Sequence, residues 1–408
     1  MRKTSLCLTL LLIIGSSFHG ILSTFLRFGL EQSENAYINL LIQGWKEGLI
    51  AILFLLALAS KKRFTKIQIL ITAFIALGVI ISLIQGIDLS QIIWGGRTEF
   101  SFLILLFALI SLSQFWSKED KNTLIKTFLY SGIAVVAFGL ILSIIGHDKL
   151  TILGFRNDWS TFYPGEAPAF CQKEAGTDFC RLQSTFYSAN RYAGFLLIFI
   201  PLAWTQYKNS AAKLAIISAA VLSLALTLST SGWLAGLFML VIYIAYLNKK
   251  TIQKHMKFIA TSTIMAISIS IIAAINFIPE LKDSDAAHVT QALDTIEAIL
   301  SNPMGHGLAF SGPASSLFNA ELLPENWFLQ VTANLGILGL ILFIWIWHET
   351  LKNLVKAKAI TALILIGILT QNLFIHAFEE PGLYVMLMCL IAISLSPQST
   401  IAKKSQKE

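Results

Sequence analysis

Stretches of about twenty mostly apolar residues recur along almost the whole chain and alternate with short runs of charged residues. A helix of this length crosses the hydrocarbon core of a bilayer. Hydrophobic residues make up 55% of the chain and charged residues 13%, which would leave a water-soluble fold with far too much exposed apolar surface. The pattern therefore predicts an all-α polytopic membrane protein, with residues 1–408 forming a single transmembrane domain.

The apolar stretches predict about twelve transmembrane helices. The first follows Met1-Arg2-Lys3 without a convincing cleavage site, so we expect an uncleaved helix rather than a signal peptide. The seventh and eighth share one apolar run, which we divide at residues 229–232, where small polar residues permit a tight turn. An undivided run would give eleven helices. The expected spans are 5–26, 37–59, 67–87, 92–114, 123–145, 187–205, 211–228, 231–247, 257–278, 326–347, 358–376 and 381–396.

Lysine and arginine gather in every second connection between these spans. Under the positive-inside rule such connections face the cytoplasm, so both termini are expected there, in a multi-pass protein of a bacterial inner membrane. The same distribution explains the net charge of +7 without nucleic acid as a partner. The basic runs are Arg2 and Lys3, Lys61 to Lys66, Lys118 to Lys126, Lys208 and Lys213, Lys249 to Lys257, Lys352 to Lys358, and Lys403 to Lys407.

Two connections on the opposite, periplasmic side are long: residues 146–186 and 279–325. Long loops that fold within a compact protein usually carry function, so both are expected to be structured. The first contains Cys171 and Cys180, for which an oxidising compartment favours a disulfide. The second contains a helical pattern over residues 289–300.

The sequence contains no nucleotide-binding glycine-rich loop, no zinc-protease helix motif and no cysteine-rich metal pattern. Cys171 and Cys180 have no histidine at ligand spacing nearby, so a zinc site is not expected. The sequence therefore gives no support to an ATP-driven pump or a zinc enzyme.

Arg181 and Arg191 lie in a polar segment that leads into the sixth span. A helix N-terminus favours an anion through its backbone N–H groups and its dipole, and arginine binds phosphate in a bidentate manner. The segment therefore predicts an anion site, to which Asn190 and, from the outer end of the fourth span, Arg97 contribute. The alternative is that the arginines only anchor the chain at the membrane surface.

Two further polar segments lie in and after the second long loop. Residues 301–307 contain Gly305-His306-Gly307, which on its own is typical of a helix stop. Residues 324–330 place Glu325 and Asn326 at the outer end of the tenth span. There Glu325 is either a helix cap or a functional carboxylate.

Together these segments resemble the O-antigen ligase and polymerase superfamily over residues 181–340. Residues 181–194 are similar to that family's Arg-x-x-Gly-Thr-Phe-x-x-x-Asn-x-x-Ala-Gly segment. Residues 229–233 resemble its Thr-x-Ser-Arg-Gly hairpin, although Thr230 stands where the family has arginine. The remaining matches are Asn302-Pro303, Gly305-x-Gly307, Glu325-Asn326, Gln330 and Gly336-x-x-Gly339.

The resemblance implies a metal-independent membrane glycosyltransferase with a GT-C-like fold and no cofactor. Its donor is a glycan on undecaprenyl diphosphate at the periplasmic face, and its acceptor is a lipid A-core sugar, a growing polysaccharide or a protein. Arginines stabilise the charge that develops on the diphosphate, and a loop residue accepts the proton of the acceptor hydroxyl. The residues expected to bind substrate are Arg181, Arg191, Arg97, Asn190 and Asn326.

The proton acceptor implied by the resemblance is Glu325 or His306. The ligases usually carry histidine near the position of Glu325, so the carboxylate would replace it as base. His306 and His376, both expected on the outer side, are the other candidates. Because ligases, polymerases and protein glycosyltransferases share these motifs, the acceptor stays open.

Lys46 and Glu47 lie within the second span, where charges are costly and usually functional. Adjacent residues on a helix point about 100° apart, so we expect these two not to pair face to face and one of them to meet a partner on another helix. A structural ion pair within the bundle is the favoured interpretation.

Two other classes of function stay open. A secondary transporter of a small anion should carry midplane charges on broken helices, whereas this sequence concentrates its polar groups in the outer loops. A structural assembly factor would perform no chemistry, and substitutions at the residues named above would then have no effect.

Overall fold

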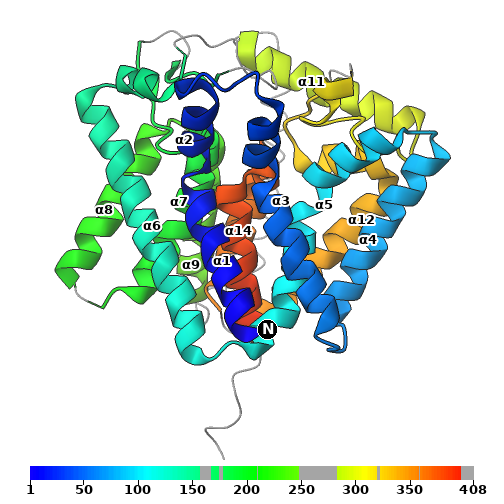
Figure 1. Cartoon of the computed structure of the whole chain (residues 1–408), viewed down its shortest axis with the longest axis horizontal. Helices are drawn as coiled ribbons and strands as arrows, with labels where there is room; N and C mark the ends of the chain where they lie inside the picture. The colour runs from blue at the N-terminus through cyan, green and yellow to red at the C-terminus, as the bar shows by residue number, and fades with distance from the viewer. Residues whose placement is uncertain are drawn as a thin grey trace, which may run out of the picture.

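The computed structural model describes residues 1–156, 167–173, 178–208, 210–247, 283–318, 322–357 and 359–396, so the expected span 257–278 lies outside the described residues. Helices dominate this part of the chain and pack side by side in one bundle (Figure 1). They are α1 (Arg2–Ser17), α2 (His19–Thr24), α3 (Ala36–Ala59), α4 (Lys66–Ile84), α5 (Leu89–Leu112), α6 (Lys118–Ile145), α7 (Ala189–Gln206), α8 (Ser210–Leu226), α9 (Thr230–Leu247), α11 (Asp283–Ser301), α12 (Trp327–Lys356), α13 (Thr361–Gln371) and α14 (Pro381–Leu395).

Shorter elements complete the described chain. The long apolar run of the seventh and eighth spans is broken at residues 227–229, between α8 and α9. Residues 167–181 contribute a small antiparallel hairpin, β1 (Gln172–Lys173) and β2 (Cys180–Arg181). The remaining short helices are η1 (Phe25–Gly29), η2 (Ser113–Phe115), η3 (His147–Leu153), η5 (Ser315–Phe318) and η6 (Ala377–Glu379).

Five of the described helices are long and apolar enough to cross a membrane, which agrees with an all-α membrane protein. A sixth crossing results if α1 and the α2–η1 segment, bent by 72° at their junction, form one span. Three further helices are apolar but shorter, namely α8, α13 and α14. The five are Lys66–Ile84, Leu89–Phe115, Lys118–Ile145, Thr230–Leu247 and Trp327–Lys356.

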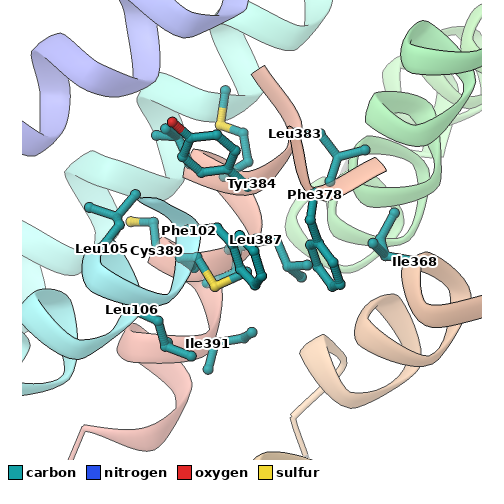
Figure 2. Packing of buried hydrophobic residues seen from close by; sticks show 14 of the residues in the cluster. Phe102, Leu105, Leu106, Ile368, Phe378, Leu383, Tyr384, Leu387, Cys389 and Ile391 are labelled. Carbon is teal, nitrogen blue, oxygen red and sulfur yellow. The ribbon is translucent and has the colours of Figure 1, made fainter. Parts of the chain in front are cut away.

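Helix α14 lies at the centre of the bundle, against α1, α5 and α7 (Figure 1). Its sequence is apolar all round, which is typical of a helix surrounded on every side, and residues 381–392 are all buried. Pro381 suits the first turn of the helix because its missing N–H would be unpaired there in any case. Figure 2 shows α14 side chains such as Leu387 packed with Phe102 of α5 and Ile368 of α13.

Helix α12 reverses direction at Gly336, where the backbone is not helical. Trp327 and Trp347 lie on either side of this break, and each has its ring centre within 6.2 Å of the Phe102 ring centre. In a straight helix, twenty residues would separate them by about 30 Å along the axis. The expected straight span 326–347 is therefore wrong, because residues 327–335 fold back beside residues 337–356.

The turn over residues 303–307 is inserted into this break. The backbone N–H groups of His306 and Gly307 donate to the carbonyls of Ala333 and Asn334, and Ile337 donates to the carbonyl of Pro303. A Cβ on Gly336, whose φ is +69°, would come within 2.4 Å of the Met304 carbonyl carbon. The glycine-rich segment, whose pattern on its own is typical of a helix stop, therefore packs against Gly336 and bonds to both sides of the break. We call this contact between residues 303–307 and the break in α12 the clamp.

Helices α13 and α1 depart from the spans expected for them, whereas α14 matches the expected 381–396 within one residue. The expected helix 358–376 ends at Gln371, since residues 372–380 form an irregular turn before Pro381. The expected helix 5–26 bends sharply at Phe18. Both departures bring polar backbone and side chains into the interior of the bundle rather than leaving them at its ends.

The two ends of the bundle differ. The N-terminus of the chain lies at the end opposite to α11, which runs across the other end (Figure 1). At the N-terminal end, Arg2 pairs with Asp120 of α6 and Lys66 pairs with Glu349 of α12. Asp120 also completes a capping box with Ser117, so these ion pairs fasten helix ends.

Candidate functional site

Charged side chains converge in the interior of the bundle, on the side that faces α11. They come from α3, α5, α7, the first part of α12 and the turn between α13 and α14. We call this group the central polar cluster; it consists of Lys46, Glu47, Arg97, Glu99, Arg191, Gln330, Asn334, His376, Glu379 and Glu380. Ionisable residues in such a position are functional candidates by default, because their burial among apolar helices is costly.

Glu47 links two helices at one edge of the cluster. Its Oε1 accepts from Arg97 Nε of α5 at 2.8 Å and lies 3.6 Å from Lys46 Nζ. The expectation that Lys46 and Glu47 would not pair is therefore wrong, because the flexible lysine side chain reaches its neighbour. The expected partner on another helix is Arg97, which also lies over the ring of Trp94. Arg97 is 26% exposed, so solvent reaches this edge.

Arg191 and Glu380 form the second ion pair of the cluster, with Nη1 3.3 Å from Oε2. Both side chains are placed by helix ends. Ser188 caps α7 by accepting from the Arg191 N–H, and Glu380 caps α14 by accepting from Gly382. Arg191 is 29% exposed whereas Glu380 is 3% exposed, so the guanidinium borders solvent and the carboxylate lies behind it.

Gln330 joins two carboxyl groups deeper in the cluster. Its Nε2 donates to Glu99 Oε1 at 2.6 Å and to Glu379 Oε1 at 3.2 Å, and Asn334 Nδ2 donates to the same Glu99 oxygen at 2.8 Å. Burial and the neighbouring Glu99 carboxyl raise the pKa of Glu379 to about 8, although Gln330 and Arg191 act in the opposite direction. Glu379 can therefore exchange a proton near neutral pH.

Several buried polar atoms in and beside this cluster have no hydrogen-bond partner in the described structure. An unpaired buried polar atom costs free energy, and proteins tolerate it mainly where function requires it. Their concentration here marks the cluster as the leading candidate site. The atoms are Glu47 Oε2, Glu99 Oε2, Trp327 Nε1, Gln330 Oε1 and His376 Nε2.

Arg181 and Asn190 make hydrogen bonds within the chain. Arg181 donates from Nε to the Thr227 carbonyl and from Nη2 to Asn190 Oδ1, so it ties the β-hairpin to α7 and to the end of α8. A disulfide joins Cys171 and Cys180, with Cα atoms 5.1 Å apart, and closes this hairpin. These contacts hold α7, and with it Arg191, in place.

The expected anion site at the start of α7 has few backbone donors left. Gln172 Oε1 of the hairpin accepts from the Ala189 N–H at 3.1 Å, and Ser188 accepts from Arg191. A free helix N-terminus offers its first N–H groups to an anion, but here two of them are already bonded. The side chain of Arg191, rather than the helix end, is the feature that can meet a ligand.

His306 lies in the clamp that holds the break in α12. Its Nε2 is 2.9 Å from the Ala298 carbonyl of α11, and its ring stacks on Phe310 with centres 4.0 Å apart. Among the described residues, no hydrogen bond or ion pair connects His306 with the central polar cluster. The geometry thus favours a structural role for this histidine over the expected role as base.

Glu325 and Asn326 begin α12 next to the α13–α14 turn. Asn326 is the helix cap, accepting from Phe328 and Leu329, and its Nδ2 donates to the Leu373 carbonyl. The cap is therefore not Glu325, which has a φ of +44°. A left-handed conformation costs a residue other than glycine about 1 kcal/mol, and such strain is often kept at functional sites.

Sequence reasoning identified Glu47 but missed the other three carboxyl groups of the cluster. Glu379 and Glu380 stand immediately before a proline-started apolar helix, and Glu99 follows Arg97 by two residues within an apolar span. Each is a charge in or beside a predicted span, which is the signal that could have identified it. Gln330 was part of a recognised motif but carried no predicted role.

Within the described ranges, no three His, Cys, Asp and Glu side chains are arranged as ligands for a metal ion. No protein-family model matches the chain, and no curated protein does.

Proposed function

We propose that this protein transfers a glycan from an undecaprenyl-diphosphate-linked donor to an acceptor at the outer face of a bacterial inner membrane. The acceptor class is that of the O-antigen ligases and polymerases which the motifs resemble: a lipid A-core sugar, a growing polysaccharide or a protein. The observation that carries the proposal is the convergence of Arg97, Arg191 and Lys46, from three helices, on the carboxyl groups of Glu47 and Glu380 inside an apolar bundle. Arginine pairs of this kind suit a diphosphate.

The topology proposed for this function has about twelve spans and two cytoplasmic termini. Residues 146–186 and 279–325 then lie in the periplasm. The distribution of lysine and arginine supports this arrangement, and so does the position of the N-terminus opposite to α11 (Figure 1). The donor lipid would reach the cluster from the outer leaflet.

The chemistry needs charge stabilisation and a proton acceptor. As the bond between the sugar C1 and the diphosphate oxygen breaks, negative charge grows on the leaving group, and fixed guanidinium groups stabilise it. The acceptor hydroxyl loses its proton as its oxygen bonds to C1. The donor itself supplies the driving force. Two carboxyl groups near the α13–α14 turn, Glu325 and Glu379, are the candidates for receiving the proton.

Charge balance sets a condition on this scheme. Among the described side chains of the cluster, Lys46, Arg97 and Arg191 face the carboxyl groups of Glu47, Glu99, Glu379 and Glu380. Four ionised carboxylates would repel a diphosphate. Binding therefore requires that the donor displace a carboxylate from its arginine, or that part of this carboxyl set be protonated.

The test is deletion of the gene in its host, followed by electrophoresis of the lipopolysaccharide. Loss of polymer on the lipid A-core, with lipid-linked polymer accumulating, indicates ligase activity, and a single repeat on the core indicates polymerase activity. Complementation with Arg97→Ala or Arg191→Ala should fail, whereas Arg2→Ala, at the opposite end of the bundle, should restore the phenotype. Full complementation by both cluster variants would contradict the proposal.

A secondary transporter of a small anion is the second candidate, and two observations favour it. Helix α12 is broken at Gly336, and charges lie within α3 and α5, so the polar groups are less confined to outer loops than the sequence indicated. Broken helices and midplane charges are typical of transporters. Flux of bicarbonate or phosphate into proteoliposomes, absent in Arg191→Ala, would support transport, and no flux with intact glycan transfer would exclude it.

A further inference from the structure

Two buried carboxyl groups share one amide nitrogen in the central polar cluster. Gln330 Nε2 carries two hydrogens, and it donates to both Glu99 Oε1 and Glu379 Oε1. Asn334 adds a second donor to Glu99 and is itself fixed by Ser311, whose N–H donates to Asn334 Oδ1 at 2.8 Å. The two carboxyl groups are therefore held together by side chains that cannot themselves supply or remove a proton.

Two negative charges cannot both be stable in this arrangement. Glu99 is 1% exposed, and no lysine, arginine or histidine of the described chain forms an ion pair with it. The carboxyl group on the other side of the Gln330 amide is Glu379. When two carboxyl groups share a site of low polarity, one of them keeps a proton. Glu99 Oε2 and Gln330 Oε1 are both buried without a hydrogen-bond partner among the described residues.

We propose that Glu99 and Glu379 hold one exchangeable proton between them, and that Glu379 accepts the proton which the acceptor hydroxyl releases. The inference rests on the proposed glycan transfer. In the step, the shared proton lies on Glu99, the O–H bond of the acceptor breaks, and the released proton passes to an oxygen of the ionised Glu379 carboxylate. The acceptor oxygen bonds to the sugar C1, and the bond from C1 to the diphosphate oxygen breaks with its electron pair on the diphosphate.

The pair is suited to this step because gaining a second proton makes it neutral, so no charged carboxylate then remains at this buried site. Glu379 is partly exposed whereas Glu99 is buried behind it, so Glu379 is the member that substrate can reach. The groups that act on Glu379 are Arg191 from α7, Glu99 from α5 and Gln330 from α12; His376 and Glu380 belong to the same turn and interact electrostatically with Arg191.

Infrared titration tests the shared proton without any substrate. The purified full chain in lipid nanodiscs should show a protonated-carboxyl C=O band that persists at neutral pH and disappears as the pH rises above about 8. Glu379→Gln and Glu99→Gln should each remove or shift this band, whereas Glu349→Gln, at the opposite end of the bundle, should leave it unchanged. If the C=O band is identical in the wild type and in both cluster variants, Glu99 and Glu379 do not share a proton.

The pH dependence of transfer tests the catalytic step. The donor is the lipid-linked polymer that accumulates in the deletion strain, and the acceptor is the membrane fraction of that strain. Glu379→Gln should lower the rate about 10²- to 10⁴-fold at every pH. Glu99→Gln should lower the rate less than Glu379→Gln does and should shift the acidic limb of the profile to lower pH, because Glu379 then no longer faces a second carboxyl group.

Glu325→Gln tests the other candidate for the proton acceptor. If it abolishes transfer while Glu379→Gln is as active as the wild type, the proton acceptor is Glu325 and the inference is wrong, although the proposed function stands. If the wild-type chain transfers no glycan at all while the infrared band behaves as expected, the proposed function fails and the shared proton stands. Unchanged thermal unfolding of each variant shows that the changes in rate are not caused by misfolding.

Discussion

The central polar cluster and the ion pairs at the N-terminal end of the bundle use the same residue types in different surroundings. Arg2 and Lys66 are each 54% exposed and bind carboxylates that fasten helix ends. Exposed pairs of this kind contribute little to stability. Arg97 and Arg191 are about half as exposed, and two carboxyl oxygens of their cluster, Glu47 Oε2 and Glu99 Oε2, have no hydrogen-bond partner among the described residues. The comparison indicates that the ion pairs at the N-terminal end hold helix ends together, whereas the central polar cluster can bind a ligand or exchange a proton.

The largest difference in activity and stability is expected between two variants that each remove one cation, one in the central polar cluster and one at the N-terminal end. Arg191→Met should abolish the activity of the protein and should also lower the free energy of unfolding by about 3 kcal/mol, because Glu380 would be left buried without its partner. Lys66→Met should leave activity intact. Complementation of the deletion strain and thermal unfolding in detergent measure the two effects. Equal activity of both variants would erase the distinction between the two regions.

A change in the backbone clamp should affect the cluster from a distance. Gly336→Ala places a Cβ against the Met304 carbonyl in a conformation that only glycine adopts readily, so we expect a loss of more than about 3 kcal/mol in unfolding free energy. Gly48→Ala in α3 is the matched control, because no atom lies within 4 Å of the added carbon. It should be neutral or slightly stabilising. If Gly336→Ala has the same free energy of unfolding as the wild type, α12 does not reverse at this residue.

Stability should depend on pH through the cluster in a defined direction. The pKa of Glu379 rises from 4.5 to about 8 in the folded chain, so the folded state holds a proton that the unfolded state has released. Stability is then greatest below about pH 4.5 and falls as the pH rises toward 8. Glu379→Gln should flatten the melting temperature over this interval, whereas Glu349→Gln should not. If the melting temperatures of the wild type and of Glu379→Gln change with pH in parallel, Glu379 does not hold a buried proton in the folded chain.

The smallest effect is expected at the N-terminal end. Asp120→Asn weakens the pair with Arg2 and one half of the capping box of α6, so unfolding free energy should fall by about 1 kcal/mol or less. Added salt should reduce the difference from the wild type, since the Arg2 side of the pair is exposed. A loss comparable to that of Arg191→Met would show that burial does not separate the two regions.

Much of the fold follows from local sequence patterns. Apolar length predicted most of the helices, and the small polar residues at 229–232 predicted the break between α8 and α9 within a few residues. The reversal of α12 could not be predicted in this way, because residues 327–356 are apolar enough to form one span. Gly336 adopts its conformation only because the 303–307 turn, distant in sequence, bonds to both sides of the break.

The candidate site was predicted less completely than the fold. Arg97 and Arg191 were identified because arginine in or beside an apolar span is conspicuous, and both belong to the cluster. Glu99, Glu379 and Glu380 come from elements that meet only through tertiary packing, so no spacing in the sequence connects them. Arg181 was assigned to substrate because its hydrogen bonds to Thr227 and Asn190 cannot be read from the chain.

The shortness of α13 and α14 has an electrical consequence. Helices of 11 and 15 residues extend only about 16 and 22 Å, whereas the hydrocarbon core of a bilayer is about 30 Å thick. The turn that carries Glu379 would then lie below the outer surface of the bilayer. If water fills the space beside the partly exposed Arg97 and Arg191, it carries the outer potential down to this turn. Most of the transmembrane voltage would fall across the protein on the far side of this turn. We therefore expect proton uptake at Glu379 to be nearly independent of the membrane potential, which proteoliposomes held at different voltages would reveal.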